Sequence, residues 1–460
     1  MRIHILGICG TFMGGIAALA RAAGHQVSGS DANVYPPMST QLASLGIPLL
    51  EGWSAEHLKP APDLVLVGNA LSRGNPELEA VLARGLAYTS GPQWLAENLL
   101  RRQHVLAVAG THGKTTTGSM LAWILEHADL NPGYLIGGLP RDFKVSARAG
   151  GGKYFVVEAD EYDTAFFDKG SKFLHYRPQT LVLNNLEYDH ADIFPDLASI
   201  QTQFHYLVRT VPGNGLIVVN GADAALQEVL ARGCWTERET FSLTEADWAA
   251  RHVAEDGSAF TVTYRGKTAA MVEWELLGKH NVANALAAMA AAHHVGVIPS
   301  QAAEALIRFR GVKRRLELRA QVDGVTVYDD FAHHPTAIAA TLGGLRRHVG
   351  SERIIALLEP RSASMKLGVH RDSLAGALTD ADRVFVYRAP NVTWDVAAAI
   401  QPLGERASVS ADLTQLLDAV TAEVRSGDHV LIMSNGGFGS VHEKLIERLQ
   451  RRTAATSQPQ

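Results

Sequence analysis

The chain has 460 residues, and a prior of about 150 residues per domain predicts about three domains. Its net charge is 42 − 47 = −5, so we expect neither a nucleic acid nor an anionic membrane as a partner. The two cysteines, Cys9 and Cys234, exclude a disulfide framework and suit a reducing compartment. The first residues read as a strand rather than a signal peptide, and no run of about 18 apolar residues predicts a membrane helix, so we expect a cytoplasmic protein.

The first segment, residues 1–103, begins with the pattern of a nucleotide-binding βαβ unit. The predicted elements, in order, are a strand over 3–6, a small-residue loop over 7–15 (GICGTFMGG), a helix over 16–24 and a strand over 26–30. Such a loop lets a pyrophosphate approach the start of the helix, and Asp31 after the second strand can bind a ribose hydroxyl. The pattern is irregular, because Cys9 and Phe12 stand where dinucleotide-binding loops carry glycine. A plain tight turn, with Asp31 as a helix cap, is the alternative.

The most informative stretch is residues 105–117, which read VLAVAGTHGKTTT. An apolar strand, a loop with two glycines and the start of a helix form the arrangement that binds polyphosphate through backbone N–H groups. Lys114 can reach the β- and γ-phosphates, and the hydroxyl of Thr115 can bind Mg²⁺. Val108 occupies the place of the first glycine of the usual phosphate loop, so an ordinary strand-to-helix turn is the alternative.

Two further predicted strands carry polar residues at their carboxyl ends. The strand over 154–157 is followed by Glu158, and the strand over 180–183 is followed a few residues later by His190. In a parallel sheet these ends lie at the same edge as the phosphate loop. A carboxylate and an imidazole beside a triphosphate are suitable ligands for Mg²⁺, so the sequence predicts a magnesium site there. A surface carboxylate and a core histidine are the alternatives.

The rest of the second segment, which ends near residue 311, contains a small β region over 235–275 and then an alanine-rich helix. Asn281 and Asn284 lie three residues apart at the start of this helix, and so on one face of it. Their amides can bind the edge of an adenine base. Helix capping is the alternative role.

The third segment, residues 312–453, again alternates strands, polar loops and helices, which predicts a second doubly wound sheet. Its strands are predicted over residues 325–328, 354–358, 384–387 and 429–433. Arg361 and Lys366 follow the second of these strands. The polar tail, residues 454–460, is predicted to be disordered.

Five motifs in this order resemble the Mur ligase family of bacterial cell-wall enzymes. They are GICGTFMGG (7–15), GTHGKTT (110–116), EADE (158–161), HNVAN (280–284), and RRLE (314–317) followed by DDFAHHP (329–335). The resemblance covers nearly the whole chain. It implies an α/β fold of three domains: a Rossmann-like domain (1–103), a central P-loop ATPase-like domain with a parallel sheet (104–311) and a C-terminal Rossmann-like domain (312–453).

The resemblance implies an ATP-dependent ligase that forms an amide bond through an acyl-phosphate, with UDP-N-acetylmuramate as the acid and Mg²⁺ as the metal. DDFAHHP is close to the branch that adds L-alanine. The stretches 31–40, 359–368 and 434–439 look more like the branch that adds the tripeptide L-alanyl-γ-D-glutamyl-meso-diaminopimelate in peptidoglycan recycling. We therefore expect the tripeptide, with L-alanine as the alternative. A non-catalytic nucleotide-binding protein and a P-loop ATPase that couples hydrolysis to motion are alternatives of other classes.

The resemblance also implies a role for individual residues. Lys114, Glu158 and His190 would act in catalysis, and Thr115, Glu158 and His190 would hold metal. The residues expected to bind ATP are Gly110, Thr111, His112, Gly113, Lys114, Thr115, Thr116, Asn281, Asn284, Arg315 and Asp330. Those expected to bind the UDP-sugar are Gly7, Cys9, Gly10, Thr11, Phe12, Met13 and Asp31, and those expected to bind the peptide are Arg361, Lys366 and Asn435. Arg361 and Lys366 would bind carboxylates of the peptide, and two solvated surface cations are the alternative. No lysine could be assigned as the carbamylated metal ligand of some relatives, and we expect a monomer or weak homodimer.

Overall fold

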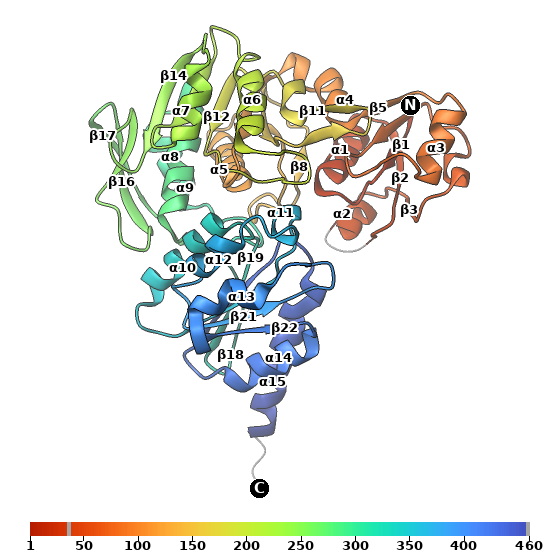
Figure 1. The fold of residues 1–460 in the computed structure, drawn as a ribbon. Helices are drawn as coiled ribbons and strands as arrows, with labels where there is room; N and C mark the ends of the chain where they lie inside the picture. Colours follow the sequence, from red (N-terminus) through yellow and green to blue (C-terminus); the bar gives the residue numbers. More distant parts are fainter. Residues whose placement is uncertain (35–37, 457–460) are drawn as a thin grey trace.

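The computed structural model describes residues 1–34 and 38–456. Residues 35–37, which belong to the stretch 31–40 cited above, and residues 457–460 lie outside the described residues. Three β-sheets, each flanked by helices, form three lobes that follow one another along the chain (Figure 1). The predicted α/β class with three sheets is therefore confirmed. No helix in the described ranges is long and apolar enough to cross a membrane.

The first lobe is a five-stranded parallel sheet in the order β3-β2-β1-β4-β5. This is the order of a dinucleotide-binding fold around its first strand. The strands are β1 (Arg2–Leu6), β2 (Gln26–Asp31), β3 (Leu49–Glu51), β4 (Leu64–Val67) and β5 (Tyr88–Ser90). The helices are α1 (Thr11–Ala22), α2 (Met38–Ser44), α3 (Pro76–Ala83) and α4 (Gly91–Asn98), with the short 3₁₀ turns η1 (Ala55–Leu58) and η2 (Leu100–Arg102).

The central sheet has ten strands in the order β17-β16-β15-β14-β13-β12-β6-β9-β7-β8. Its buried parallel part comprises β6 (His104–Ala109), β7 (Gly133–Leu135), β9 (Tyr154–Ala159), β12 (Thr180–Leu183), β13 (Leu216–Asn220), β14 (Glu237–Ser242) and β15 (Trp248–Arg251). The antiparallel additions are β8 (Ala147–Arg148), β16 (Ala259–Tyr264) and β17 (Lys267–Glu273). The predicted β region over 235–275 therefore continues the central sheet.

Five helices accompany the central sheet. They are α5 (Lys114–His127), α6 (Leu197–Val208), α7 (Ala224–Ala231), α8 (Lys279–His294) and α9 (Pro299–Ile307). Helices α5 and α8 pack against each other, and most residues of both are buried, which explains why neither shows a polar face in the sequence. A small hairpin of β10 (Asp163–Ala165) and β11 (Asp168–Ser171), followed by η3 (Lys172–His175), lies beside the first lobe (Figure 1).

The third lobe is a six-stranded sheet in the order β18-β19-β23-β20-β21-β22, parallel except for β18. The strands are β18 (Glu317–Val322), β19 (Val325–Asp330), β20 (Ile354–Leu358), β21 (Arg383–Tyr387), β22 (Ala407–Ser410) and β23 (His429–Met433). The helices are α10 (Pro335–Val349), α11 (Ala363–Lys366), α12 (Arg371–Ala377), α13 (Val396–Ile400), α14 (Leu413–Glu423) and α15 (Val441–Thr456), with η4 (Gln401–Arg406) and η5 (Phe438–Ser440). Because α15 extends to Thr456, the prediction of disorder was wrong for residues 454–456.

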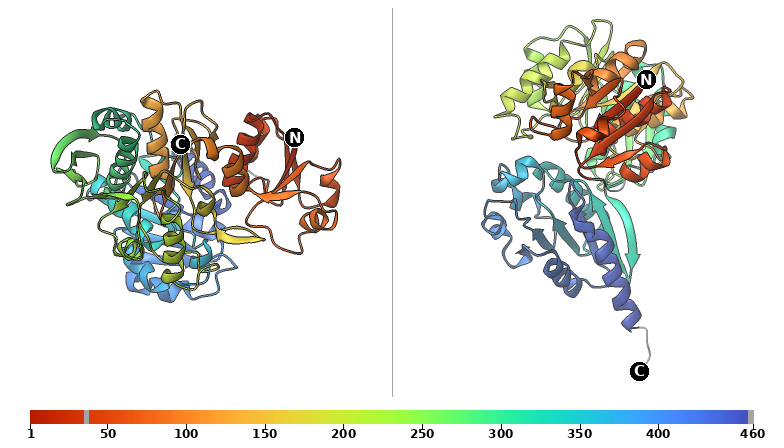
Figure 2. Two further views of the ribbon diagram at one scale, coloured as in Figure 1. Left: turned by 90° about the horizontal axis from the view of Figure 1, so that it is seen from above. Right: turned by 90° about the vertical axis from the view of Figure 1, so that its right-hand side faces the viewer.

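The first and central lobes share a hydrophobic core, whereas the third has its own. Gly15 in α1 allows the first lobe to approach the central lobe closely, because a Cβ atom there would overlap Leu135 of β7. Gly15 therefore serves close packing between the two lobes. The hydrophobic clusters of the third lobe contain only residues of that lobe, which lies below the other two in the right-hand view of Figure 2. Polar contacts, such as the hydrogen bond from Ser364 to Asp189, join it to the central lobe. The domain boundaries at residues 103 and 311 stay predictions.

Candidate active site

The predicted phosphate loop lies between the end of β6 and the start of α5, so the strand, loop and helix expected there are confirmed. Gly113 caps α5 with a φ of 77°, a conformation that favours glycine, and its helix N-terminus has no side-chain cap. A Cβ atom on Gly113 would lie 2.5 Å from Oδ1 of Asn284 and 2.6 Å from Nδ2 of Asn184. Sterics and backbone conformation therefore both require glycine, and the uncapped helix start suits a phosphate.

Lys114 folds back over this loop and pairs with two acids. Its Nζ donates to the carbonyl of Gly110 at 2.7 Å and to Oε2 of Glu161 at 2.9 Å, and it lies 3.7 Å from Oδ1 of Asp160. Burial by itself would lower the pKa of Lys114, but the charges of Glu161 and Asp160 outweigh it and raise this pKa. Sequence reasoning gave Glu161 and Asp160 no role, although both lie in the EADE motif.

Thr115 and Glu158 form the pair predicted to hold metal. The hydroxyl of Thr115 donates to Oε1 of Glu158 at 2.8 Å, and the N–H of Gly137 donates to Oε2 at 2.6 Å. Burial raises the pKa of Glu158, and the nearby charge of Asp160 adds to this. A hydroxyl and a carboxylate side by side next to a phosphate loop are the oxygen donors that Mg²⁺ prefers, so these residues fit the metal.

His190, the other predicted metal ligand, lies on the opposite side of Glu161. Its Nε2 is 3.2 Å from Oε1 of that carboxylate, and its backbone has a φ of 53°. Burial would lower the pKa of His190, but the hydrogen bond and charge of Glu161 outweigh burial and raise it. Burial would raise the pKa of Glu161, yet Lys114 and His190 together lower it to about 2. The structure thus joins two of the three predicted catalytic residues, Lys114 and His190, through one unpredicted carboxylate.

The two asparagines of α8 lie behind the loop. Oδ1 of Asn284 accepts from Nδ2 of Asn184 at 2.9 Å and from the hydroxyl of Thr117 at 3.1 Å, and its Nδ2 donates to Oδ1 of Asn281 at 3.3 Å. Nδ2 of Asn281 donates to the carbonyl of Leu277. Asn284 is 5% exposed and supports the phosphate loop, and the base contact predicted for these two amides stays a prediction.

Two residues of the third segment approach the loop. Nη2 of Arg315 lies 3.5 Å from the hydroxyl of Thr115, and its guanidinium lies 4.8 Å from the centre of the Phe331 ring. The carboxylate of Asp330 accepts from the N–H groups of Leu316 and Ala332, and burial raises its pKa. Asp330 therefore organises the linker that carries Arg315. Its predicted ribose contact stays a prediction.

The predicted sugar loop of the first lobe is closed by Asp31, whose Oδ2 accepts from the N–H of Cys9 at 2.9 Å. Gly10 caps α1 without a side-chain bond, and Gly7 has a φ of 80°. Met13 does not line this loop: it is 5% exposed and packs beside Gly68 and Gly91. The Met13 side chain therefore faces the core, and its predicted role in binding the sugar stays a prediction.

A buried lysine that the sequence did not single out connects this loop to the central site. Nζ of Lys172 lies 4.6 Å from the centre of the Phe12 ring and 4.1 Å from that of Tyr162. The side chain is 2% exposed, and no carboxylate of the described residues lies within ion-pair distance. Burial lowers the pKa of Lys172 to about 8, although the charges of Asp160 and Asp163 oppose this. A buried cation with aromatic neighbours suits a carboxylate ligand.

Arg361 and Lys366 line a cavity of about 360 Å³ in the third lobe. The other lining residues are Glu359, Pro360, Ala389, Pro390 and Asn391. Arg361 packs against Gly436, where a Cβ atom would overlap its guanidinium, and Oδ1 of the neighbouring Asn435 is buried without a hydrogen-bond partner in the described residues. Arg361 and Lys366 therefore share a polar cavity, and Asn435 lies next to Gly436, which Arg361 contacts.

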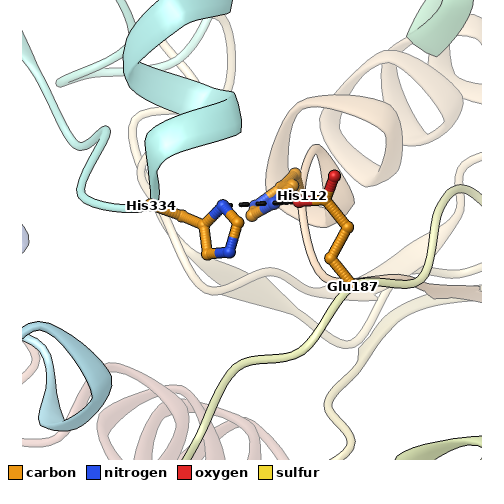
Figure 3. Close-up of side chains that lie close together, drawn as sticks. All are labelled: His112, Glu187 and His334. Atoms are coloured by element: carbon orange, nitrogen blue, oxygen red, sulfur yellow. Dashed lines mark hydrogen bonds and ion pairs between the residues drawn. The ribbon is translucent and has the colours of Figure 1, made fainter. Parts of the chain in front are cut away.

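A second cluster joins the central and third lobes (Figure 3). Nε2 of His112, in the phosphate loop, lies 2.8 Å from Oε2 of Glu187, and Nδ1 of His334 lies 3.3 Å from the same oxygen. Neither Glu187 nor His334 was predicted to be functional. The two adjacent histidines of the DDFAHHP motif gave the one hint of a functional role for His334. The motif could not show that Glu187, far away in the chain, lies beside it.

A phosphate loop with a magnesium-type ligand pair, set between two Rossmann-like sheets, is the arrangement of a nucleotide-dependent enzyme. Models of the Mur ligase family match three parts of the chain: the catalytic domain over 2–103, the middle domain over 108–292 and the glutamate ligase domain over 314–436. The chain therefore belongs to the Mur ligase family of ATP-dependent ligases.

The chain is similar over its full length to curated members of two branches. It is 55% identical to the UDP-N-acetylmuramate–L-alanyl-γ-D-glutamyl-meso-2,6-diaminoheptandioate ligase of Escherichia coli K12, covering 99% of this chain and 100% of that one. It is 33% identical to the UDP-N-acetylmuramate–L-alanine ligase of Desulforapulum autotrophicum, covering 97% and 98%.

Solved structures show the same two branches. The murein peptide ligase of Psychrobacter arcticus 273-4 matches with 47% identity and a TM-score of 0.78, covering 98% of this chain and 99% of that one. The UDP-N-acetylmuramate–alanine ligase of Thermotoga maritima matches with 25% identity and a TM-score of 0.82, covering 98% and 100%. The fold does not separate the branches, whereas the identity favours the first.

Proposed function

We propose that this protein is an ATP-dependent ligase that joins UDP-N-acetylmuramate to L-alanyl-γ-D-glutamyl-meso-diaminopimelate through an acyl-phosphate, in peptidoglycan recycling. The observation that carries the proposal is the full-length identity of 55% to a ligase named for these substrates, against 33% for one named for L-alanine. A cytoplasmic location belongs to this proposal, because ATP is supplied in the cytoplasm. A monomeric or weakly dimeric state is also part of it.

ATP and Mg²⁺ fit the central site. The uncapped start of α5 and Gly113 would receive the phosphates, with Lys114 and Arg315 as their counter-charges. Thr115 and Glu158 would hold Mg²⁺, and His190 would lie near enough to help with a second ion. With ATP bound, these groups stabilise the charge that develops as the γ-phosphoryl group moves to the muramate carboxylate.

The position of Lys172 is evidence that a substrate carboxylate binds between the first and central lobes. Its ammonium contacts Phe12 of the predicted sugar loop, and it lies close enough to the EADE motif to feel the charges of Asp160 and Glu158. We propose that Lys172 holds the carboxylate of the muramate in line for phosphoryl transfer. Such positioning requires a fixed cation at the junction of the two lobes.

The third lobe would receive the tripeptide. Its carboxylates call for counter-charges, which Arg361 and Lys366 supply, and its ammonium group at the diaminopimelate end calls for an acid such as Glu359. Asn435 adds an unpaired buried acceptor beside them. A pocket lined by both acidic and basic side chains suits a zwitterionic peptide. L-alanine would need only a small pocket.

The test is ADP release from ATP with UDP-N-acetylmuramate and each amine in turn. We expect turnover with the tripeptide and little with L-alanine at the same concentration. Turnover with L-alanine alone would move the chain to the other branch. ADP release without any UDP-sugar would indicate an ATPase, and no ADP release with any amine would indicate a non-catalytic nucleotide-binding protein.

A further inference from the structure

Three side chains from distant parts of the chain meet where the central and third lobes touch. His112 belongs to the phosphate loop, Glu187 follows β12, and His334 caps the start of α10 (Figure 3). One ligand atom from each residue lies within 4.8 Å of the other two. Two imidazoles and a carboxylate form the ligand set of many zinc sites.

The spacing of these atoms suits a four-coordinate metal. Ligand atoms at about 2.0–2.1 Å from Zn²⁺ lie roughly 3.3 Å apart in a tetrahedral site. Oε2 of Glu187 lies 2.8 Å from Nε2 of His112 and 3.3 Å from Nδ1 of His334. The two distances to Glu187 therefore lie within about 0.5 Å of the tetrahedral spacing, and the two histidine nitrogens lie within 4.8 Å of each other.

The protonation states also suit a metal. Burial would raise the pKa of Glu187, but its hydrogen bond to His112 and the surrounding charges lower this pKa to about 2. Burial, together with the charges of His112 and His370, lowers the pKa of His334 to about 3. At neutral pH the carboxylate is ionised and the imidazole of His334 is neutral, as metal ligands must be.

A third histidine, His370, lies beside His334 of this cluster. The ring of His370 lies with its centre 4.3 Å from that of the His334 ring. Nε2 of His370 is buried and has no hydrogen-bond partner within the described ranges. His370 is therefore a neighbour of the cluster, although it does not belong to the group of ligand atoms that lie within 4.8 Å of one another.

A hydrogen-bonded clasp without metal is the competing explanation. The hydroxyl of Thr336 donates to Oε1 of Glu187 at 3.0 Å, and the N–H of Thr336 donates to Nδ1 of His334 at 3.3 Å. The second bond is long, so an ion at Nδ1 displaces only a weak helix cap.

We propose that His112, Glu187 and His334, with water as the fourth ligand, bind a first-row transition-metal ion, for which Zn²⁺ fits best. This site is distinct from the Mg²⁺ ligands Thr115 and Glu158. The ion ties the phosphate loop to the start of α10 and so fixes the third lobe against the central one. The inference does not rest on the proposed function, because metal binding is measured without substrates.

The experiment is a Co²⁺ titration of the full chain after chelator treatment, in excess Mg²⁺ and without ATP. We expect one equivalent of Co²⁺ to bind with an affinity on the order of micromolar or tighter. The visible bands of a four-coordinate site should appear, Zn²⁺ should displace the Co²⁺, and Zn²⁺ should raise the thermal midpoint. Absence of tight binding, or displacement by Mg²⁺, overturns the proposal.

Two variants locate the ion. His334→Asn keeps a good helix cap and removes the ligand nitrogen, and Glu187→Gln removes the ligand charge. Each should weaken Co²⁺ binding by about tenfold or more. His252→Asn is the control, because His252 is exposed and has a φ of 49°, which asparagine tolerates. Binding that is equally strong in the control and in either folded ligand variant places the ion elsewhere and overturns the proposal.

Discussion

The ammonium nitrogen of Lys114 lies 2.9 Å from Oε2 of Glu161, a carboxylate that also faces His190. A phosphate-loop lysine is expected to meet the phosphates of a nucleotide. Here it is held by a carboxylate of the protein, so binding of ATP must exchange one anionic partner of Lys114 for another. Without a phosphate in the loop, Glu161 holds the ammonium group of Lys114 beside it.

Replacing Glu161 by glutamine should therefore separate stability from nucleotide binding. Both partners are buried, and loss of one charge leaves the other without full compensation, so we expect a loss of about 3 kcal/mol in the free energy of unfolding. The affinity for ATP should not fall, because the competitor of the phosphates is removed. Denaturant unfolding and nucleotide titration give the two values. Glu56→Gln, at an exposed ion pair, is the control and should cause no measurable loss. A tenfold weaker affinity for ATP would contradict the exchange.

Glu158→Gln should raise the Mg²⁺ concentration needed for half-maximal ADP release by about tenfold or more. An amide offers only one oxygen, and its NH₂ group faces either the hydroxyl of Thr115 or the N–H of Gly137. Steady-state rates at varied Mg²⁺ and saturating ATP provide the measurement. The matched control is Glu273→Gln on the exposed side of β17, whose Mg²⁺ dependence should equal that of the wild type. An unchanged Mg²⁺ dependence of Glu158→Gln would argue against Glu158 as a ligand.

Lys172→Met should raise the KM for UDP-N-acetylmuramate by about tenfold or more and leave the affinity for ATP nearly unchanged. The methionine keeps the apolar contacts with Phe12 and Tyr162 but removes the charge that we assign to the carboxylate. Initial rates at varied UDP-sugar give this KM. Lys169→Met, at an exposed ion pair on the same hairpin, is the control. A change confined to ATP would place Lys172 with the nucleotide instead.

Reversing the charges of Arg361 and Lys366 together should raise the KM for the tripeptide by about a hundredfold, because two charge-assisted contacts become repulsive. The KM for ATP should change little. Arg371→Glu, an exposed cation near the same lobe surface, serves as the control. If the tripeptide KM stays at the wild-type value, the two side chains are solvated surface cations.

Acid should destabilise the fold between pH 6.5 and 4 through buried neutral histidines. His104 and His294 both bond the hydroxyl of Thr180 at 2.8 Å, which can donate to only one of them. Burial, with the charges of His294 and Lys153, lowers the pKa of His104 to about 4. Below pH 6.5, His104 binds a proton in the unfolded chain but not in the folded chain. The free energy of unfolding therefore falls until the pH reaches the folded-state pKa of about 4.

The size of this effect at His104 should be about 1–2 kcal/mol, since the residue is only partly buried and solvent screens part of the effect. Unfolding free energies of the wild type and of His104→Gln, measured from pH 7.5 to pH 4.5, should converge as the pH falls. His252→Asn should keep the wild-type slope. Parallel curves for the wild type and His104→Gln would show that the acid sensitivity comes from other groups.

Parts of the site could be predicted because they depend on neighbours in the chain. The strand, the glycines and the helix around Lys114 act over about ten residues, and Gly113 is needed for its own backbone angle. Thr115 and Glu158 could be paired from the rule that strand ends share one edge of a parallel sheet. The three α/β sheets followed from the alternation of apolar strands and helices.

Only the tertiary structure decided which partner each of these groups meets. Lys114 pairs with Glu161, Asn284 supports the phosphate loop, and the Met13 side chain packs into the core. Lys172 and the His112–Glu187–His334 cluster join residues that local periodicity cannot relate. The sequence by itself determined the elements and the phosphate loop, because hydrophobic pattern and backbone preference are local. The packing of distant side chains decided the charge partners, because those energies depend on distance and burial.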